Sequence, residues 1–137
     1  ADGRGFAAAM MLGAEAVQMG TRFLVAAECT VHDNYKKKVI AAKDIDSEVT
    51  GRVNGHPVRQ IRNKLTREYL QMEKQGASFE EMEHLTLGSL RKAVVEGDVV
   101  SGTLMAGQIA GMVSKEQTCA EMIAEIMDQA ETLLKLK

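Results

Sequence analysis

A short apolar run between two glycines does most to constrain how this chain can fold. Residues 14–19 (Ala-Glu-Ala-Val-Gln-Met) follow Gly13 and end at Gly20. Before them, Asp2 can cap a helix over residues 4–12, and Gly13 suits the left-handed position that ends such a helix. A run this short after a tight helix stop is typical of a buried parallel strand. The start of the chain therefore predicts helix, turn, strand and glycine loop, which is one step of an α/β fold.

Beyond this step the sequence predicts mainly helices, interrupted by one extended stretch. That stretch, residues 44–63, carries β-branched residues between glycines and a proline, so we expect extended, partly irregular structure there. The last helix has apolar residues at 3.6-residue spacing and is expected to follow a capping box of Ser114 and Gln117. Ser78 and Glu81 predict a second capping box. Other predicted helices cover residues 23–28, 34–42, 64–76, 78–87 and a segment from residue 90 that Gly97 ends.

Composition excludes several classes of protein. The 137 residues are 45% hydrophobic and 26% charged, as in globular chains with a sizeable core. A net charge of -2 with both signs interspersed gives no basic stripe, so no nucleic-acid partner is expected. The longest apolar stretch, residues 6–14, is too short to span a bilayer. Cys29 and Cys119 lie far apart and outside metal-site spacing, which indicates free thiols. We therefore expect a soluble, cytoplasmic protein that does not bind a membrane.

The loop that follows the predicted strand is the strongest candidate site. A glycine at the carboxyl end of a parallel strand lets the backbone approach an anion closely. The amides of Gly20 and Thr21, and the Thr21 hydroxyl, can then donate to phosphate oxygens. In (β/α)8 barrels the loops after strands seven and eight typically form such a phosphate site. Spacing alone also permits a plain turn in which Gly20 only supplies its dihedral angles, so both interpretations stay open here.

Several stretches of the chain resemble one family of flavin enzymes. Residues 1–5 (Ala-Asp-Gly-Arg-Gly) and 12–23 (Leu-Gly-Ala-Glu-Ala-Val-Gln-Met-Gly-Thr-Arg-Phe) resemble the closing barrel segment of the nitronate monooxygenase and enoyl reductase II family. Residues 55–59 (Gly-His-Pro-Val-Arg), 92–98 (Lys-Ala-Val-Val-Glu-Gly-Asp) and 105–111 (Met-Ala-Gly-Gln-Ile-Ala-Gly) resemble specifically its FMN-dependent enoyl-acyl-carrier-protein reductase branch, of the FabK type. The resemblance covers essentially the whole chain.

This resemblance implies a fold and an activity. The fold would be α/β, the C-terminal portion of a (β/α)8 TIM barrel with its seventh helix and eighth strand. Residues 1–43 would end the FMN-binding barrel, and residues 44–137 would form an extended segment and a helical C-terminal region. The activity would be reduction of the double bond of enoyl-acyl-carrier-protein in fatty acid synthesis, through FMN and with NADH or NADPH as reductant. Two alternatives are a nitronate monooxygenase of the same family and an independent helical interaction module.

The resemblance also assigns roles to residues. The segment matching the family's FMN-phosphate site consists of Gln18, Met19, Gly20 and Thr21. The segment matching a stretch near flavin and substrate consists of Met105, Ala106, Gly107 and Gln108. The family's catalytic histidine, in a Gly-Gly-His segment, and the double glycine that completes its phosphate loop both precede residue 1. We therefore expect no catalytic residue here, no metal site, and no turnover by these residues alone. Expected partners are enoyl-acyl-carrier-protein, the N-terminal part of the same protein and a second copy in a dimer.

Three other groups of residues have two interpretations each. His32, His56 and His84 lack metal-ligand spacing, so structural roles are favoured. Three lysines at residues 36–38 predict a solvated helix face, with a docking patch for an acidic carrier protein as the alternative. The nine methionines suit either an acyl-chain groove or ordinary core filling. Core filling is expected for Met10, Met11, Met122 and Met127, and the groove role for Met105.

Overall fold

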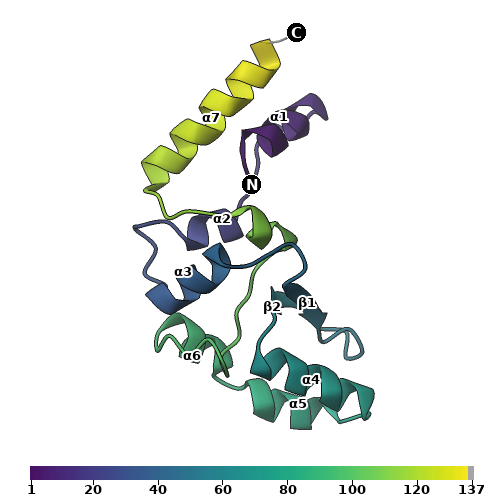
Figure 1. Cartoon of the computed structure of the whole chain (residues 1–137). Helices are drawn as coiled ribbons and strands as arrows, with labels where there is room; N and C mark the ends of the chain where they lie inside the picture. The colour runs from purple at the N-terminus through teal and green to yellow at the C-terminus, as the bar shows by residue number, and fades with distance from the viewer. Residues whose placement is uncertain (136–137) are drawn as a thin grey trace.

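Two helices from opposite ends of the chain pack side by side. The computed structural model describes residues 1–135, and in it α1 (Gly3–Met11) lies along α7 (Cys119–Lys135) (Figure 1). The buried stripe of α7 consists of Met122, Ile126 and Ala130, at the 3.6-residue spacing that the sequence predicts. Gly3 is buried at the contact, and its amide donates to the side-chain oxygen of Gln129 at 3.1 Å.

The first helix has the ends that the sequence predicts. The Asp2 carboxylate accepts hydrogen bonds from the amides of Arg4 and Gly5 at 3.1 and 3.2 Å. Gly13 has φ of +91°, the left-handed conformation that a helix stop requires. Both capping residues are therefore confirmed.

The strand predicted for residues 14–19 is not formed. These residues follow α1 as an irregular, largely exposed segment, and the two-stranded sheet of the described chain lies elsewhere. A strand is stabilised by backbone hydrogen bonds to its neighbours, and no segment within residues 1–135 lies beside this one to provide them. The apolar run alone was not sufficient to create the strand.

Two short helices follow in the middle of the molecule. They are α2 (Thr21–Leu24) and α3 (Asp33–Ile40). The helix predicted over residues 23–28 starts two residues earlier and ends at Leu24. Glu28, which the prediction placed in that helix, instead accepts the Cys119 amide with both carboxylate oxygens at 3.0 Å. The Glu28 carboxylate thereby caps the N-terminus of α7, where a negative charge is favourable.

The extended stretch forms a hairpin with a third backbone segment beside it. Strands β1 (Ser47–Thr50) and β2 (Val58–Ile61) are antiparallel, with Ser47 opposite Ile61 and Thr50 opposite Val58. On the other side of β2, the Ile61 amide donates to the Leu104 carbonyl at 2.8 Å. The prediction of extended structure over residues 44–63 is confirmed.

The remaining helices are α4 (Lys64–Lys74), α5 (Phe79–Thr86), α6 (Ser89–Val94) and the 3-10 helix η1 (Gln108–Met112). The Ser78–Glu81 capping box begins α5 as predicted. The box predicted at Ser114 and Gln117 is wrong, because α7 begins at Cys119 behind a reciprocal pair of Thr118 and Glu121. The Gln117 side chain instead accepts a hydrogen bond from Arg22 of α2 and donates one to Glu125 of α7.

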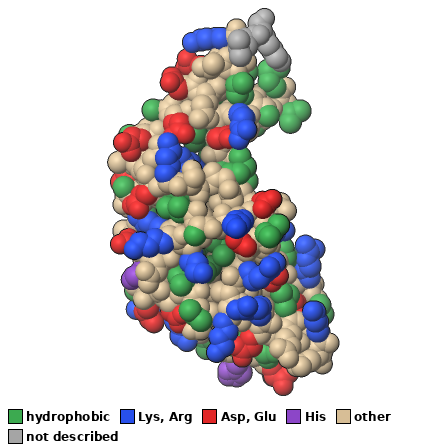
Figure 2. All heavy atoms as spheres, in the orientation of Figure 1, with side chains coloured by type: hydrophobic (Ala, Val, Ile, Leu, Met, Phe, Trp, Pro, Cys, Tyr) green, Lys and Arg blue, Asp and Glu red, His purple; other side chains and the backbone are tan. Residues whose placement is uncertain are grey.

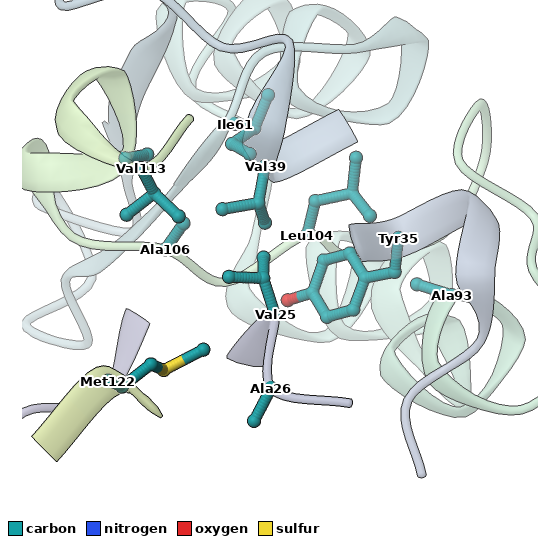
Figure 3. Close-up of a cluster of buried hydrophobic side chains, with 11 residues drawn as sticks. Val25, Ala26, Tyr35, Val39, Ile61, Ala93, Leu104, Ala106, Val113 and Met122 are labelled. Carbon is teal, nitrogen blue, oxygen red and sulfur yellow. The ribbon is translucent and has the colours of Figure 1, made fainter. Parts of the chain in front are cut away.

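One buried apolar cluster joins the two halves of the sequence (Figure 3). Tyr35 and Val25 lie beside Leu104 in its centre. The members are Val25, Ala26, Tyr35, Val39, Ile61, Ala93, Leu104, Ala106, Ala110, Val113 and Met122. Residues from both sides of the expected boundary at residue 43 share this core, so α2 and α3 are fixed against the segment at residues 104–113.

Candidate functional site

One hydrogen bond brings the two predicted site segments together. The Gly107 amide donates to the Thr21 hydroxyl oxygen at 2.9 Å. A Cβ on Gly107 would lie 3.5 Å from that oxygen, so the Gly107 backbone is in van der Waals contact with the Thr21 side chain. A hydroxyl that accepts one hydrogen bond still has its own hydrogen to donate. Thr21 can therefore join the second segment and still donate to a ligand.

A buried tyrosine fixes the second segment from the other side. The Tyr35 hydroxyl donates to the Met105 carbonyl at 2.7 Å, and Tyr35 is 1% exposed. Burial raises the pKa of Tyr35 to about 12, with the hydrogen bond to Met105 acting in the opposite direction. The Ala106 amide donates to the Arg59 carbonyl at 3.3 Å. Residues 105–107 are thus held at three points.

These contacts form one wall of an open groove of about 500 Å³. Gly20 and Thr21 lie on it together with Met105, Ala106 and Gly107. Most of the remaining lining is apolar and comes from Leu24, Leu90 and Val94, with the ring of Tyr35. The groove therefore combines an apolar wall with a short polar edge at the start of α2.

The polar edge has unused hydrogen-bond donors and one positive charge. Within residues 1–135, the amides of Gly20 and Thr21 have no acceptor, as expected at a helix start. Arg59 also lines the groove; its guanidinium donates to the Ser47 hydroxyl at 3.0 Å and forms no ion pair in the described part of the chain. Amide donors at a helix start suit an anionic ligand, and Arg59 adds a positive charge to the residues that line the same groove.

The structure gathers some of the predicted site residues and leaves others apart. Gly20, Thr21, Met105, Ala106 and Gly107 line the groove. Gln18, Met19 and Gln108 are not among the lining residues.

The sequence interpretation gave no role to Tyr35 or Arg59, which also line the groove. Arg59 did lie in a stretch quoted for the resemblance, and that was the signal that could have indicated it.

Glycine at position 20 is not required by its backbone angles. Its φ is −91°, outside the left-handed region, so other residues could adopt this conformation. A Cβ there would meet no other atom of the described chain within 4 Å. The interpretation of Gly20 as a turn residue chosen for its dihedral angles is therefore wrong, whereas its openness suits a close approach by a ligand.

The other singled-out residues divide between structural and solvent-exposed positions. His32 caps α3 through its Nδ1 atom, which accepts the Asn34 amide at 3.1 Å. His56 and His84 are exposed, and residues 1–135 hold no cluster of three candidate metal ligands. Lys36 is buried, and its Nζ donates to the Ala26 carbonyl at 2.7 Å, so the lysine triplet is not a uniform solvated face.

Of the methionines expected to fill the core, Met122 does so. Met10, Met11 and Met127 lie at least 38% exposed, and that part of the prediction is wrong. These three lie on α1 and α7, and the contact between the two helices leaves them exposed. Met105 is 41% exposed in the groove, where it was expected to contact a ligand.

Comparison with known proteins places the chain in one enzyme family. The family model of nitronate monooxygenase matches residues 1–129. FabK from Thermotoga maritima shares 45% identity with the chain and superposes with a TM-score of 0.92, over 99% of this chain and 43% of that one. The chain belongs to the nitronate monooxygenase family.

Two curated relatives carry different activities in their names. The (3aS,4S,5R,7aS)-5-hydroxy-7a-methyl-1-oxo-octahydro-1H-indene-4-carboxyl-CoA dehydrogenase of Mycobacterium tuberculosis is 30% identical over 98% of this chain and 48% of its own length. A probable nitronate monooxygenase of Staphylococcus saprophyticus is 31% identical over 97% of this chain and 37% of its own length. The chain thus spans less than half the length of these relatives.

Within residues 1–135, no helix has both the length and the apolar character needed to cross a membrane.

Proposed function

We propose that the full-length protein is an FMN-dependent enoyl-acyl-carrier-protein reductase that acts in the cytoplasm. The observation that carries this proposal is the contact between Thr21 and Gly107, which joins the candidate phosphate segment to the candidate substrate segment in one groove. The 45% identity with FabK supports the reductase branch. The independent helical module has no support, because the chain belongs to an enzyme family along almost its whole length.

The residues at the polar edge fit the phosphate of FMN. A phosphate needs several donors and a positive charge, and it must approach the backbone closely. The amides of Gly20 and Thr21 are unpaired, the surroundings of Gly20 are open, and Arg59 contributes a cation without an ionic partner in the described chain. When bound, FMN would supply the two-electron chemistry that passes a hydride from NADH or NADPH to the enoyl group.

The chain's own residues bind and orient in this proposal. Tyr35 stays protonated at neutral pH and uses its hydrogen for the Met105 carbonyl, so it does not serve as a general acid or base. Leu24, Leu90 and Val94 offer an apolar surface to an acyl chain. The proton donor is assigned to the family's histidine segment, which matches no part of this sequence.

A thioester substrate is supported by one of the relatives. The Mycobacterium tuberculosis protein is by its name a dehydrogenase of a carboxyl-CoA compound, and such a compound is a thioester. Acyl carrier protein and coenzyme A present their thioesters on the same pantetheine arm. A groove that binds the substrate of either carrier would therefore bind the same thioester group.

The second candidate is a nitronate monooxygenase. The family model and the Staphylococcus saprophyticus relative carry that name. This enzyme would bind the same flavin phosphate but would oxidise a small nitronate with oxygen. The difference lies in the substrate, so the shared cofactor site does not distinguish the two activities.

The full-length protein also needs partners that this chain lacks. Apolar side chains gather at the α1 and α7 end of the molecule (Figure 2), where Leu12 is 90% exposed and the unpaired residues 14–19 begin. We propose that the N-terminal part of the same protein covers this end and pairs with residues 14–19 as barrel strands. A dimer of the full-length protein and the acyl carrier protein are the further partners proposed.

The test is a direct comparison of substrates on the purified full-length protein. We expect oxidation of NADH or NADPH when a crotonyl thioester is added, and little oxygen consumption with a nitronate. Strong oxygen uptake with the nitronate, without thioester reduction, would replace the first proposal by the second.

A further inference from the structure

A second cavity lies on the hairpin, between β1, β2 and the helices α4 to α6. Its volume is about 310 Å³, at the lower end of the range for ligand pockets. The strands contribute Thr50 and Gln60, and the helices contribute Tyr69, Phe79 and Ser89. Met105 lines both this cavity and the cofactor-facing groove, so the two spaces adjoin.

The cavity holds a buried acceptor that has no partner. Gln60 is 3% exposed, and its amide nitrogen donates to the Thr50 hydroxyl at 2.8 Å. The other atom of that amide, Oε1, is buried and has no hydrogen bond within residues 1–135. Leaving such an atom unpaired is unfavourable, and native proteins rarely do so without a reason.

Four of the five hydroxyls that line the cavity do not serve this acceptor, because their hydrogens are already committed, and the fifth, on Tyr69, makes no hydrogen bond to it. Thr50 donates to the Val58 carbonyl and Thr86 to the Met82 carbonyl. Ser89 donates to the Thr86 carbonyl at 2.6 Å, so Thr103 is the donor in its own 2.6 Å contact with Ser89. The four hydroxyls therefore offer lone pairs to the cavity rather than hydrogens.

The remaining lining decides between a charged and a neutral donor. Glu83, the only carboxylate among the described lining residues, is exposed. Burying an ammonium beside Gln60 would thus be costly without a buried counter-charge. A neutral N–H carries no such cost, and Val58, Phe79 and Leu90 provide an apolar border. The lining suits an amide with apolar flanks.

We propose that this hairpin cavity binds the pantetheine arm of the thioester substrate, with an amide N–H of the arm donating to Gln60 Oε1. The choice of pantetheine rests on the proposed thioester function. Pantetheine is a neutral, flexible chain with two amides, and the shared Met105 joins its cavity to the groove where the thioester would react. The donor reaches Oε1 after rotation of the Gln60 amide about its terminal torsion, which has a broad minimum, and this rotation gives up the bond from the amide nitrogen to Thr50.

The test measures pantetheine binding to the full-length, FMN-loaded protein by titration calorimetry. Gln60→Met keeps the length of the side chain and removes the acceptor, so binding should weaken about tenfold, as for one hydrogen bond to a buried acceptor. Gln71→Met, on the exposed face of α4, is the matched control and should bind as the wild type does. Gln60→Met removes the hydrogen bond to Thr50 as well as the unpaired oxygen, so the melting temperature is measured to confirm that the variant is folded.

Two results would overturn the assignment: no pantetheine binding at millimolar concentration, or equal affinity in the wild type and Gln60→Met. Coenzyme A and holo-acyl carrier protein are titrated in parallel, and the ligand that binds more tightly while retaining the Gln60 dependence identifies the carrier. Turnover is measured separately. If the protein reduces the thioester but binds pantetheine equally well with and without Gln60, only the cavity assignment is overturned. If it oxidises the nitronate and its pantetheine binding depends on Gln60, only the proposed function is overturned.

Discussion

The Thr21 hydroxyl and the Gly107 amide are hydrogen-bonded at 2.9 Å although 86 residues separate them in the sequence. Thr21 lies at the start of α2, and Gly107 directly precedes η1, so the bond fixes the two helix starts relative to each other. Whatever binds at the amides of Gly20 and Thr21 is thereby placed beside Met105 and Ala106. This contact makes the groove a single site.

We expect Thr21→Val to destabilise the full-length protein by about 1–2 kcal/mol, because the Gly107 amide loses its acceptor in a half-buried position. Denaturant titration of the free energy of unfolding checks this value. Thr21→Ser retains the hydroxyl and should recover most of the loss. If valine and serine were equally stable, the hydrogen bond would not be a significant contact.

We expect Gly20→Val to lose FMN without unfolding. A Cβ at position 20 meets no atom of the described chain within 4 Å, and the φ of −91° is accessible to valine, so the fold should tolerate it. Its branched side chain would nevertheless obstruct a phosphate at the Gly20 and Thr21 amides. Flavin absorbance per protein and circular dichroism of the full-length variant measure the two effects. A variant that purifies fully yellow would contradict the phosphate assignment.

Tyr35 should make the protein sensitive to alkaline pH. Its pKa is raised from 10.0 to about 12 in the folded state, so the folded state holds the proton more tightly than the unfolded state. The corresponding stability is fully present below pH 10 and is lost as pH rises towards 12, by about 2–3 kcal/mol in total.

Tyr35→Phe is the control for this pH dependence. The variant should be less stable at pH 7 by about 1 kcal/mol, since the Met105 carbonyl loses its donor. It should also lose less stability than the wild type between pH 9 and 11. Parallel pH profiles of the two proteins would argue against the buried, hydrogen-bonded hydroxyl.

Two neighbouring glycines of α1 should respond oppositely to alanine. A methyl group at Gly3 would collide with the Gln129 side chain and with the α7 backbone at Ile126, so Gly3→Ala should cost about 1–3 kcal/mol. At Gly5 nothing lies within 4 Å, and Gly5→Ala should stabilise the helix by about 0.5–1 kcal/mol. Melting temperatures of the two full-length variants give the comparison, and an unchanged or higher value for Gly3→Ala would mean that α1 and α7 do not pack as described.

Local signals in the sequence determined much of the secondary structure. Asp2 and Gly13 delimit α1, Ser78 and Glu81 begin α5, and the β-branched stretch gives the hairpin. These features depend on side chains and amides within a few residues of one another, which is why they can be read from the sequence. The family resemblance likewise depends on contiguous residues.

Tertiary structure decided what local patterns leave open. Residues 14–19 have the composition of a strand but no neighbour within residues 1–135 to pair with, because strand hydrogen bonds come from another segment. Glu28 lies outside its predicted helix and caps α7 across 91 residues of sequence. The bond from Gly107 to Thr21 and the unpaired Gln60 depend on segments that meet only after folding. The sequence therefore determined the ends of α1, the start of α5 and the family, while packing decided which residues share a site.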